Sequence, residues 1–254
     1  MKFIVKGVQA LYSVYALLLF VAILLVISPL VIVASFFGKL KGGNFICALC
    51  GVWADVWLPL VGIFHRNIYL EPHRKDHACI FVANHISYMD IPVLMKTVRQ
   101  PIRVLGKMEL SRIPVFGFLY RHAVVMVDRS SAENRARSVM MLKVILKKNV
   151  SIVIYPEGTF NTTGEPLKEF YNGAFRIAIE TQTPIKPVIF PDSKNRLHYD
   201  SMFSLTPGIS RAIFMDEVPV NGLTLADIDL LKNKVYQLME AELRKWTAST
   251  VVTA

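Results

Sequence analysis

Short apolar runs alternate with helical stretches from about residue 67 to residue 215, and this alternation predicts the fold. Runs of four to eight apolar and β-branched residues are typical of buried strands. We predict strands at residues 68–70, 79–83, 102–105, 123–127, 150–155, 185–190 and 212–215. Helices are predicted at residues 91–98, 111–121, 132–148 and 173–181, and a capping box at Thr224 and Asp227 predicts one last packing helix. This order predicts an α/β fold, with a mostly parallel or mixed sheet flanked by helices.

The first 64 residues lack this alternation because they are almost wholly apolar. Residues 7–38 contain no charged side chain. As a helix they would extend about 48 Å, which exceeds the roughly 30 Å of a bilayer core. In a second run, residues 42–64, Asp55 is the one charged residue. We therefore predict a helical membrane anchor at residues 1–64 and a globular domain at residues 65–254, with a kink or a helix end at Ser28-Pro29.

One segment joins a predicted strand to a predicted helix and carries a histidine at the junction. The strand 79–83 is followed by Asn84 and His85, and Ser87-Tyr-Met-Asp90 has the pattern of a capping box. A helix is therefore expected just past His85, with Asp90 in its first turn reaching back to the imidazole. A carboxylate that holds one ring nitrogen leaves the other free as a general base. His85 and Asp90 are thus a candidate catalytic pair, and a capped strand-end histidine without catalysis is the alternative.

A second polar segment follows the predicted strand at residues 150–155. Tyr155-Pro-Glu-Gly-Thr159 has the composition of a tight turn, in which Gly158 permits close backbone approach to a ligand. In open parallel sheets, ligands gather at the carboxyl ends of the strands. Because His85 and Glu157 both come just after a predicted strand, we expect them at the same edge of the sheet and in one site.

These segments carry a family resemblance. Asn84-His-Ile-Ser-Tyr-Met-Asp90 resembles the NHxxxxD motif of the glycerolipid acyltransferases, the family of 1-acylglycerol-3-phosphate acyltransferases. Three further blocks follow in the family's order and cover the chain to about residue 190. They are Gly106-Lys-Met-Glu-Leu110 with Pro114, Gly117 and Val127-Asp-Arg129, then Tyr155-Pro-Glu-Gly-Thr159, and then Pro184-Ile-Lys-Pro-Val188.

The resemblance implies a membrane-bound O-acyltransferase of phospholipid biosynthesis. Such an enzyme moves a fatty acyl group from acyl-CoA or acyl-carrier protein to the sn-2 hydroxyl of lysophosphatidic acid, giving phosphatidic acid. It implies that His85 is the base, oriented by Asp90, and that no metal or cofactor takes part. By the same resemblance, Lys107 and Arg129 contact the acceptor phosphate, and Glu157, Gly158 and Thr159 bind the rest of the acceptor. Backbone amides near Ser87 are the expected donors to the carbonyl oxygen.

Phe160 departs from the family, which usually has arginine after the third block as a presumed phosphate ligand. This departure leaves open an acyltransferase of the same fold that acts on another lyso-lipid, such as a lyso-ornithine lipid. A third interpretation is a membrane-anchored adaptor without catalysis, which docks through a basic face. The resemblance also favours a two-helix anchor embedded from one leaflet over a true transmembrane helix.

The net charge of +10 is concentrated near the candidate site, because residues 96–148 contain twelve Lys and Arg against three Asp and Glu. Such a surface suits membrane lipids, a phosphorylated substrate or an acidic acyl-carrier protein. Without a nucleic-acid-binding signature, nucleic acid is not an expected partner.

Three cysteines, an odd number, fit a reducing compartment. Cys47 and Cys50 have zinc spacing but no second ligand pair, so no metal site is predicted. With the short chain and no targeting extension, we expect a bacterial inner-membrane protein whose catalytic domain lies on the cytoplasmic face.

Overall fold

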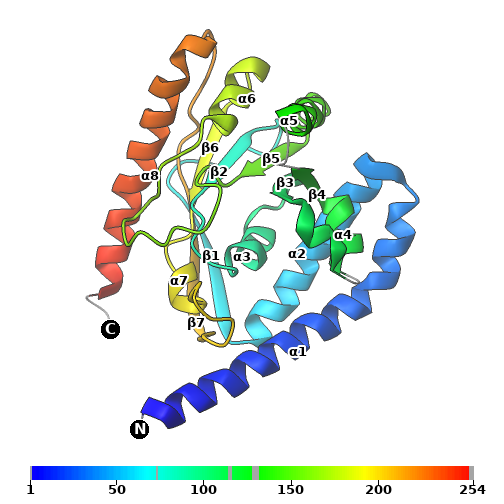
Figure 1. Ribbon diagram of the computed structural model, residues 1–254, viewed down its shortest axis with the longest axis vertical. Coiled ribbons are helices and arrows are strands. Elements are labelled where there is room, and N and C mark those ends of the chain that lie inside the picture. Colours follow the sequence, from blue (N-terminus) through cyan, green and yellow to red (C-terminus); the bar gives the residue numbers. More distant parts are fainter. Residues whose placement is uncertain (1, 73, 114–115, 128–131, 252–254) are drawn as a thin grey trace. The chain divides into compact units, whose positions relative to one another are not determined.

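The computed structural model describes residues 2–72, 74–113, 116–127 and 132–251. It confirms the α/β class, because the described residues form one seven-stranded sheet with helices packed against it (Figure 1). The strand order is β1-β7-β6-β2-β5-β3-β4. The strands are β1 Ile63–Tyr69, β2 Ile80–Ala83, β3 Ile102–Lys107, β4 Val124–Val127, β5 Ser151–Ile154, β6 Ile185–Ile189 and β7 Gly208–Phe214.

The sheet is mixed, as the sequence predicts. Strand β2 lies between β5 and β6 and runs parallel to both, with Ile80 opposite Ile152 on one side and Ile185 on the other. Strands β3, β4 and β5 are also parallel, and β7 is antiparallel to β6. The residues that follow β2, β3, β4 and β5 therefore emerge at one edge of the sheet, which we call the carboxyl edge.

The chain divides into two compact units. Unit 1 comprises Met1–Asn67, Ile86–Arg99 and Phe190–Ala212, and unit 2 comprises Ile68–His85, Gln100–Ile189 and Ile213–Ala254. The predicted division at residue 65 stays a prediction.

Unit 2 contains most of the sheet and its largest core. The helices and 3-10 turns of this unit are η2 Met108–Arg112, α4 Phe116–Ala123, α5 Ala132–Lys147, α6 Gly173–Thr181, η3 Leu225–Asp227 and α8 Ile228–Val251. Side chains of β2, β5, α5, α6 and α8 form one buried apolar cluster, with Phe175 and Val235 fully enclosed. Burying aromatic and branched side chains in this way is the main favourable contribution to folding.

Two helix predictions in unit 2 have different outcomes. The helix expected at residues 111–121 is confirmed for residues 116–121, which lie in α4, and is wrong at its start, where a 3-10 turn ends at Arg112. Pro114, which lies between them in the sequence, falls outside the described residues, and proline favours the first turn of a helix over its interior. The capping box at Thr224 and Asp227 is confirmed, because the Thr224 N–H donates to Asp227 Oδ2 at 2.8 Å.

Unit 1 is built on two apolar helices, α1 Lys2–Ser35 and α2 Gly43–Leu60, which a π-helical turn at Gly38–Gly42 connects. Its other helices are α3 Asp90–Thr97 and α7 Ser193–Arg196. Phe20 of α1 meets Trp53 and Trp57 of α2 edge to face at 4.5 and 5.6 Å, and the Trp57 indole donates to the Ala16 carbonyl at 2.9 Å, so aromatic side chains hold α1 against α2. Helix α1 does not end at Pro29 but continues to Ser35. By length and composition, Ile4–Ser35 and Gly38–Leu60 are each sufficient to cross a membrane.

Candidate active site

The imidazole of His85 lies between two aromatic rings of unit 2. His85 follows β2, and its half-buried ring stacks on Tyr155 with centroids 4.2 Å apart and an interplanar angle of 26°. Phe160 meets the same ring edge to face, at 4.5 Å and 71°. Aromatic pairs of these geometries contribute about 0.5–1.5 kcal/mol each beyond their burial. Tyr155 and Phe160 therefore restrict the orientation of the ring.

The backbone of His85 is bound to the same segment. Its N–H donates to Glu157 Oε1 at 2.8 Å, and its carbonyl accepts the Asn161 N–H at 2.8 Å. The predicted proximity of His85 and Glu157 at the carboxyl edge is confirmed. Residues 155–161 thus hold the ring and both backbone polar groups of the histidine, and we call them the His85 clamp.

Glu157 is the centre of this clamp. Its side chain has no exposed surface, and its second oxygen, Oε2, accepts the Lys168 N–H at 2.9 Å. A buried carboxylate that accepts backbone N–H groups forms strong, charge-assisted hydrogen bonds. The contacts that the structure shows for Glu157 are with the chain itself, and the expected contact with substrate stays a prediction.

Gly158 and Thr159 form the outer side of the clamp. Gly158 has φ +72°, and a Cβ there would approach the Tyr171 ring to 2.8 Å, so the position favours glycine for two reasons. Thr159 is exposed, and its Oγ1 accepts a hydrogen bond from Lys168 Nζ at 2.9 Å. Gly158 and Thr159 are therefore accessible to a ligand at this edge, whereas Glu157 is fully buried.

Asp90 organises the turn that follows His85 along the chain. It is fully buried at the start of α3, and its Oδ2 accepts the N–H groups of Ile86 and Ser87 at 2.8 and 2.9 Å. The reach of Asp90 back to Ser87 is the half of the predicted capping box that forms. An orienting contact between Asp90 and the imidazole stays a prediction.

The other half of that capping box is wrong, because Ser87 is not the N-cap of α3. Its hydroxyl donates to the Leu197 carbonyl at 2.5 Å and accepts the Met89 N–H at 3.0 Å, which makes a turn before the helix. The amides of Ile86, Ser87 and Met89 are all engaged within this turn, and oxyanion donors near Ser87 stay a prediction.

One of the two predicted phosphate ligands, Lys107, lies at the end of β3, and the other, Arg129, follows β4 in the sequence. Lys107 ends β3 opposite Val127, which ends β4, so the chain of both strands reaches the carboxyl edge. The Lys107 side chain, Asp128 and Arg129 lie outside the described residues, and both ligands stay predictions. Before Lys107, a Cβ at Gly106 would overlap the Tyr120 hydroxyl. Burial, with a smaller effect of Glu109, raises the pKa of Tyr120 to about 12, so this hydroxyl keeps its proton.

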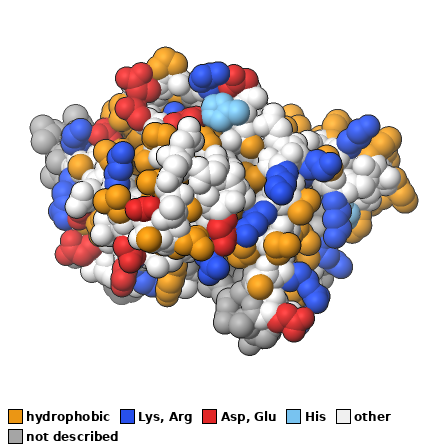
Figure 2. Space-filling model, turned by 90° about the horizontal axis from the view of Figure 1, so that it is seen from above, with side chains coloured by type: hydrophobic (Ala, Val, Ile, Leu, Met, Phe, Trp, Pro, Cys, Tyr) orange, Lys and Arg blue, Asp and Glu red, His pale blue; other side chains and the backbone are white. Residues whose placement is uncertain are grey.

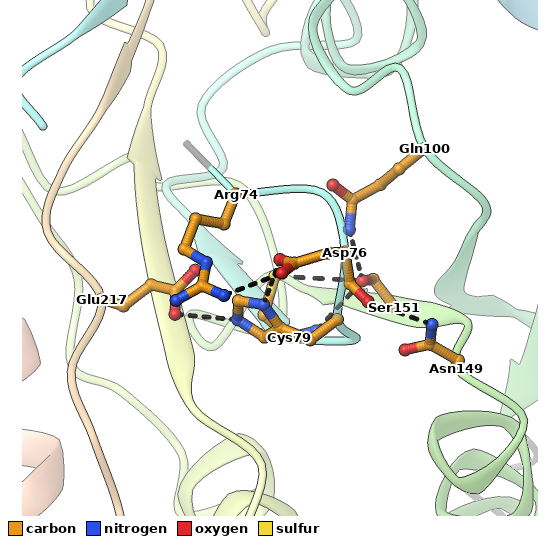
Figure 3. Close-up of polar contacts among 8 residues, drawn as sticks. Arg74, Asp76, Cys79, Gln100, Asn149, Ser151 and Glu217 are labelled. Atoms are coloured by element: carbon orange, nitrogen blue, oxygen red, sulfur yellow. Dashed lines mark hydrogen bonds and ion pairs between the residues drawn. The ribbon is translucent and has the colours of Figure 1, made fainter. Parts of the chain in front are cut away.

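The opposite edge of the sheet carries a separate polar cluster (Figure 3). His77 lies three residues before β2, and its Nδ1 and Nε2 are each 3.0 Å from a carboxylate oxygen, of Asp76 and Glu217 respectively. The pKa of His77 is raised, mainly by the hydrogen bond to Asp76 and also by Glu217, and burial opposes this rise. Arg74 donates to Asp76 at 2.8 Å in the same cluster. No group of three or more His, Cys, Asp or Glu side chains in the described ranges can hold a metal ion.

The aromatic contacts and the Asn161 bond were not predicted from the sequence. Their signal was nevertheless present, because all three partners of His85 lie within six residues of Glu157, which the strand order placed beside His85.

Comparison with known proteins gives one consistent result. Residues 65–191 match the family model described as Acyltransferase. The chain is 30% identical to human 1-acyl-sn-glycerol-3-phosphate acyltransferase beta over 174 residues, which is 66% of this chain and 62% of the human protein. It is 28% identical to the 1-acyl-sn-glycerol-3-phosphate acyltransferase of Haemophilus influenzae over 193 residues, 74% of this chain and 78% of that protein. The match thus spans less than two thirds of the human relative.

The fold is also found in a solved structure. The crystal structure of the 1-acyl-sn-glycerophosphate (LPA) acyltransferase PlsC from Thermotoga maritima superposes with a TM-score of 0.74. The alignment covers 98% of each chain at 21% identity. At this identity the likeness shows the fold, including the helical N-terminal part, and no more.

Proposed function

The chain belongs to the acyltransferase family, and on that premise we propose that it transfers a fatty acyl group from a thioester to the free sn-2 hydroxyl of lysophosphatidic acid. The product is phosphatidic acid, and the donor is acyl-CoA or acyl-carrier protein. The observation that supports this proposal is the His85 clamp, since residues 155–161 hold the ring and backbone of one histidine at the carboxyl edge. The names of the human and bacterial relatives supply the substrate.

The proposed chemistry is direct acyl transfer. A nitrogen of His85 removes the proton of the acceptor hydroxyl while that oxygen attacks the thioester carbonyl. The tetrahedral intermediate then collapses, the carbon–sulfur bond breaks, and the thiolate takes the proton from the imidazolium. General-base catalysis of this kind contributes about 10²–10⁴ in rate. Asp90 orders the turn after His85 and orients the ring, and Lys107 and Arg129 bind the acceptor phosphate.

A second acceptor is kept as a candidate because of Phe160. This side chain contacts the His85 ring at the position where the family usually has arginine. A guanidinium binds phosphate through paired hydrogen bonds, which a phenyl ring cannot form. An acceptor without phosphate, such as a lyso-ornithine lipid, would fit an apolar wall there.

The proposed location is a membrane surface, with the catalytic domain on the cytoplasmic face. Helix α1 contains no charged residue after Lys6 and keeps much of its apolar surface exposed, including Leu11 and Val26. Exposed apolar surface of this extent marks an interaction site, and the length of α1 suits a bilayer.

The test is acyl transfer by the detergent-solubilised protein, with labelled acyl-CoA or acyl-carrier protein as donor and either lysophosphatidic acid or a lyso-ornithine lipid as acceptor. We expect His85→Ala to lose transfer at least a hundredfold while its circular dichroism is unchanged. The matched control is His77→Ala, which removes the other imidazole that borders β2, at the opposite edge of the sheet.

Each result has a defined meaning. Transfer to lysophosphatidic acid alone supports the proposed function, and transfer to the ornithine lipid alone replaces it with the second candidate. Full activity in His85→Ala overturns the proposed mechanism. Absence of His85-dependent transfer to both acceptors favours a membrane-anchored adaptor.

A further inference from the structure

Helix α5 of unit 2 presents apolar side chains on two sides. On the inner side, Leu142 and Leu146 are buried in the core of the unit. On the outer side, Met140, Met141 and Val144 have 61%, 43% and 55% of their surface exposed. An amphipathic helix that covers a sheet needs only its inner apolar side. The outer side is therefore a candidate contact surface.

Basic side chains extend the outer apolar side at both ends. Arg137, with 75% of its side chain exposed, precedes the two methionines, and Lys147 and Lys148 follow Val144. These positions recur at spacings of three and four residues, so they share one face of the helix. We call residues 137, 140, 141, 144, 147 and 148 the α5 stripe. Arg137 lies 3.5 Å from Glu133 one turn earlier, an ion pair in which both side chains are mostly exposed. Lys143 is not part of the stripe, since its largely covered side chain pairs with Glu180 of α6 at 2.7 Å.

Helix α5 starts from the same edge of the sheet as the candidate site, with β5 and β3 between β2 and β4. Helix α5 follows β4, which is parallel to β3 and ends in register with it at the carboxyl edge, where His85 follows β2. The sixteen residues of α5 extend about 24 Å from that edge. A partner bound along the stripe would have one end close to the edge at which the acyl group must arrive.

We propose that the α5 stripe docks an acidic carrier protein that delivers the acyl thioester. The proposal rests on the proposed function and chooses between its two donors. Complementary charge steers such partners together and sets their register, and the segment that contains α5 is strongly basic. On the face of the molecule drawn in Figure 2, several Lys and Arg side chains lie directly beside hydrophobic ones. Flexible methionine side chains adapt to the apolar face of a partner helix.

A lipid bilayer is the less suitable occupant of this surface. The stripe exposes only three apolar side chains, none of them aromatic, and basic side chains flank them at both ends. Helices that lie in a membrane interface have a broad apolar face with Trp, Phe or Leu. Helix α1 has such a surface and α5 does not.

The experiment compares two donors that carry the same acyl chain. The test variant is Arg137→Glu with Lys147→Glu, and the control variant is Lys75→Glu with Lys234→Glu, which makes the same charge change at exposed positions elsewhere in unit 2. We expect the test variant to lower kcat/KM about tenfold or more with acyl-carrier protein and less than twofold with acyl-CoA. The control variant should change neither rate. A third variant, Met140→Ser with Val144→Ser, should repeat the selective loss without a change of charge.

Binding separates this proposal from the proposed function. Fluorescence anisotropy of a labelled acyl-carrier protein measures docking without turnover, and the test variant should weaken it about tenfold at low salt. Equal binding by wild type and test variant overturns the docking site, whatever the activity. An equal loss with both donors, or a wild type that uses acyl-CoA alone, overturns it as well. Loss of binding to anionic vesicles with carrier binding intact would reassign the stripe to lipid.

Discussion

The backbone N–H of His85 donates to Glu157 Oε1 across 2.8 Å, although the two residues are 72 positions apart in the chain. The contact exists because β2 and β5 are adjacent parallel strands that end at the same edge. The other oxygen of Glu157 is engaged with the Lys168 N–H, and the side chain is fully enclosed. Glu157 is thus placed to act on the reaction through the position of His85.

The variant Glu157→Gln tests this role. A glutamine can accept one of the two N–H groups, but its amide NH₂ opposes the other, and an unsatisfied buried group costs about 1–3 kcal/mol. Because the cost falls on the His85 segment, kcat should fall about tenfold while KM for the acceptor stays within twofold. Glu169→Gln, an exposed neighbour, is the control. A raised KM with an unchanged kcat would instead support direct contact of Glu157 with the acceptor.

Phe160→Arg tests the choice of acceptor. The guanidinium would lie beside the His85 ring, where Phe160 now makes its edge contact at 4.5 Å. Paired hydrogen bonds to phosphate should raise the ratio of kcat/KM for lysophosphatidic acid over a lyso-ornithine lipid about tenfold. Phe160→Leu, which loses the ring without adding charge, is the comparison. If the two variants shift the ratio equally, position 160 has no part in reading the headgroup.

The sequence was sufficient for the sheet and for the pairing of His85 with Glu157. Apolar runs such as residues 79–83 coincide with strands because burial on both faces demands continuous apolar sequence. The alternation of strands and helices then predicted parallel strands, which places His85 and Glu157 at the same edge of the sheet. Neither inference needed a side-chain contact.

Contacts between distant segments account for what the sequence did not predict. Helix α3 begins at Asp90 because Leu197, 110 positions away, accepts the hydroxyl of Ser87. Strand β1 begins at Ile63, five residues before the strand predicted at 68–70. The prediction missed its first half because His65, Arg66 and Asn67 interrupt the apolar run. Asn67 in that strand donates to the Thr97 carbonyl, a partner that no local pattern reveals.

Asp55 in the apolar helix α2 should stabilise unit 1 through α3. Its Oδ1 pairs with both Lys96 and Arg99, and all three side chains are partly exposed. Partly exposed ion pairs contribute about 0–1 kcal/mol each. Asp55→Asn should therefore lower Tm by about 2–4 °C in detergent, and the combination with Lys96→Ala should cost less than the sum of the two single changes. Strictly additive losses would mean that the pair is not coupled in solution.

His65 of β1 predicts an acid-sensitive stability. Its Nε2 bonds Asn67 at 2.7 Å and its Nδ1 lies 3.3 Å from the Ser210 hydroxyl. The pKa of His65 is lowered to about 4. Burial is the largest cause and the positive charges of Lys96 and Arg99 contribute, whereas the hydrogen bond to Asn67 opposes the shift. Below its ordinary value of 6.5, the unfolded chain binds this proton and the folded chain does not. The contribution to stability is therefore complete above pH 6.5 and is lost as the pH falls toward 4.

Unfolding free energies at pH 7.5 and pH 4.5 measure this loss. The shift corresponds to about 2–3 kcal/mol over that interval, at about 1.36 kcal/mol for each pKa unit. Other groups also titrate there, so the informative quantity is the difference between wild type and His65→Gln, whose side chain does not ionise. Wild type should lose about 2 kcal/mol more than the variant, whereas His122→Gln, on α4, should follow wild type. The same pH dependence in wild type and His65→Gln would show that His65 does not remain neutral in the folded chain.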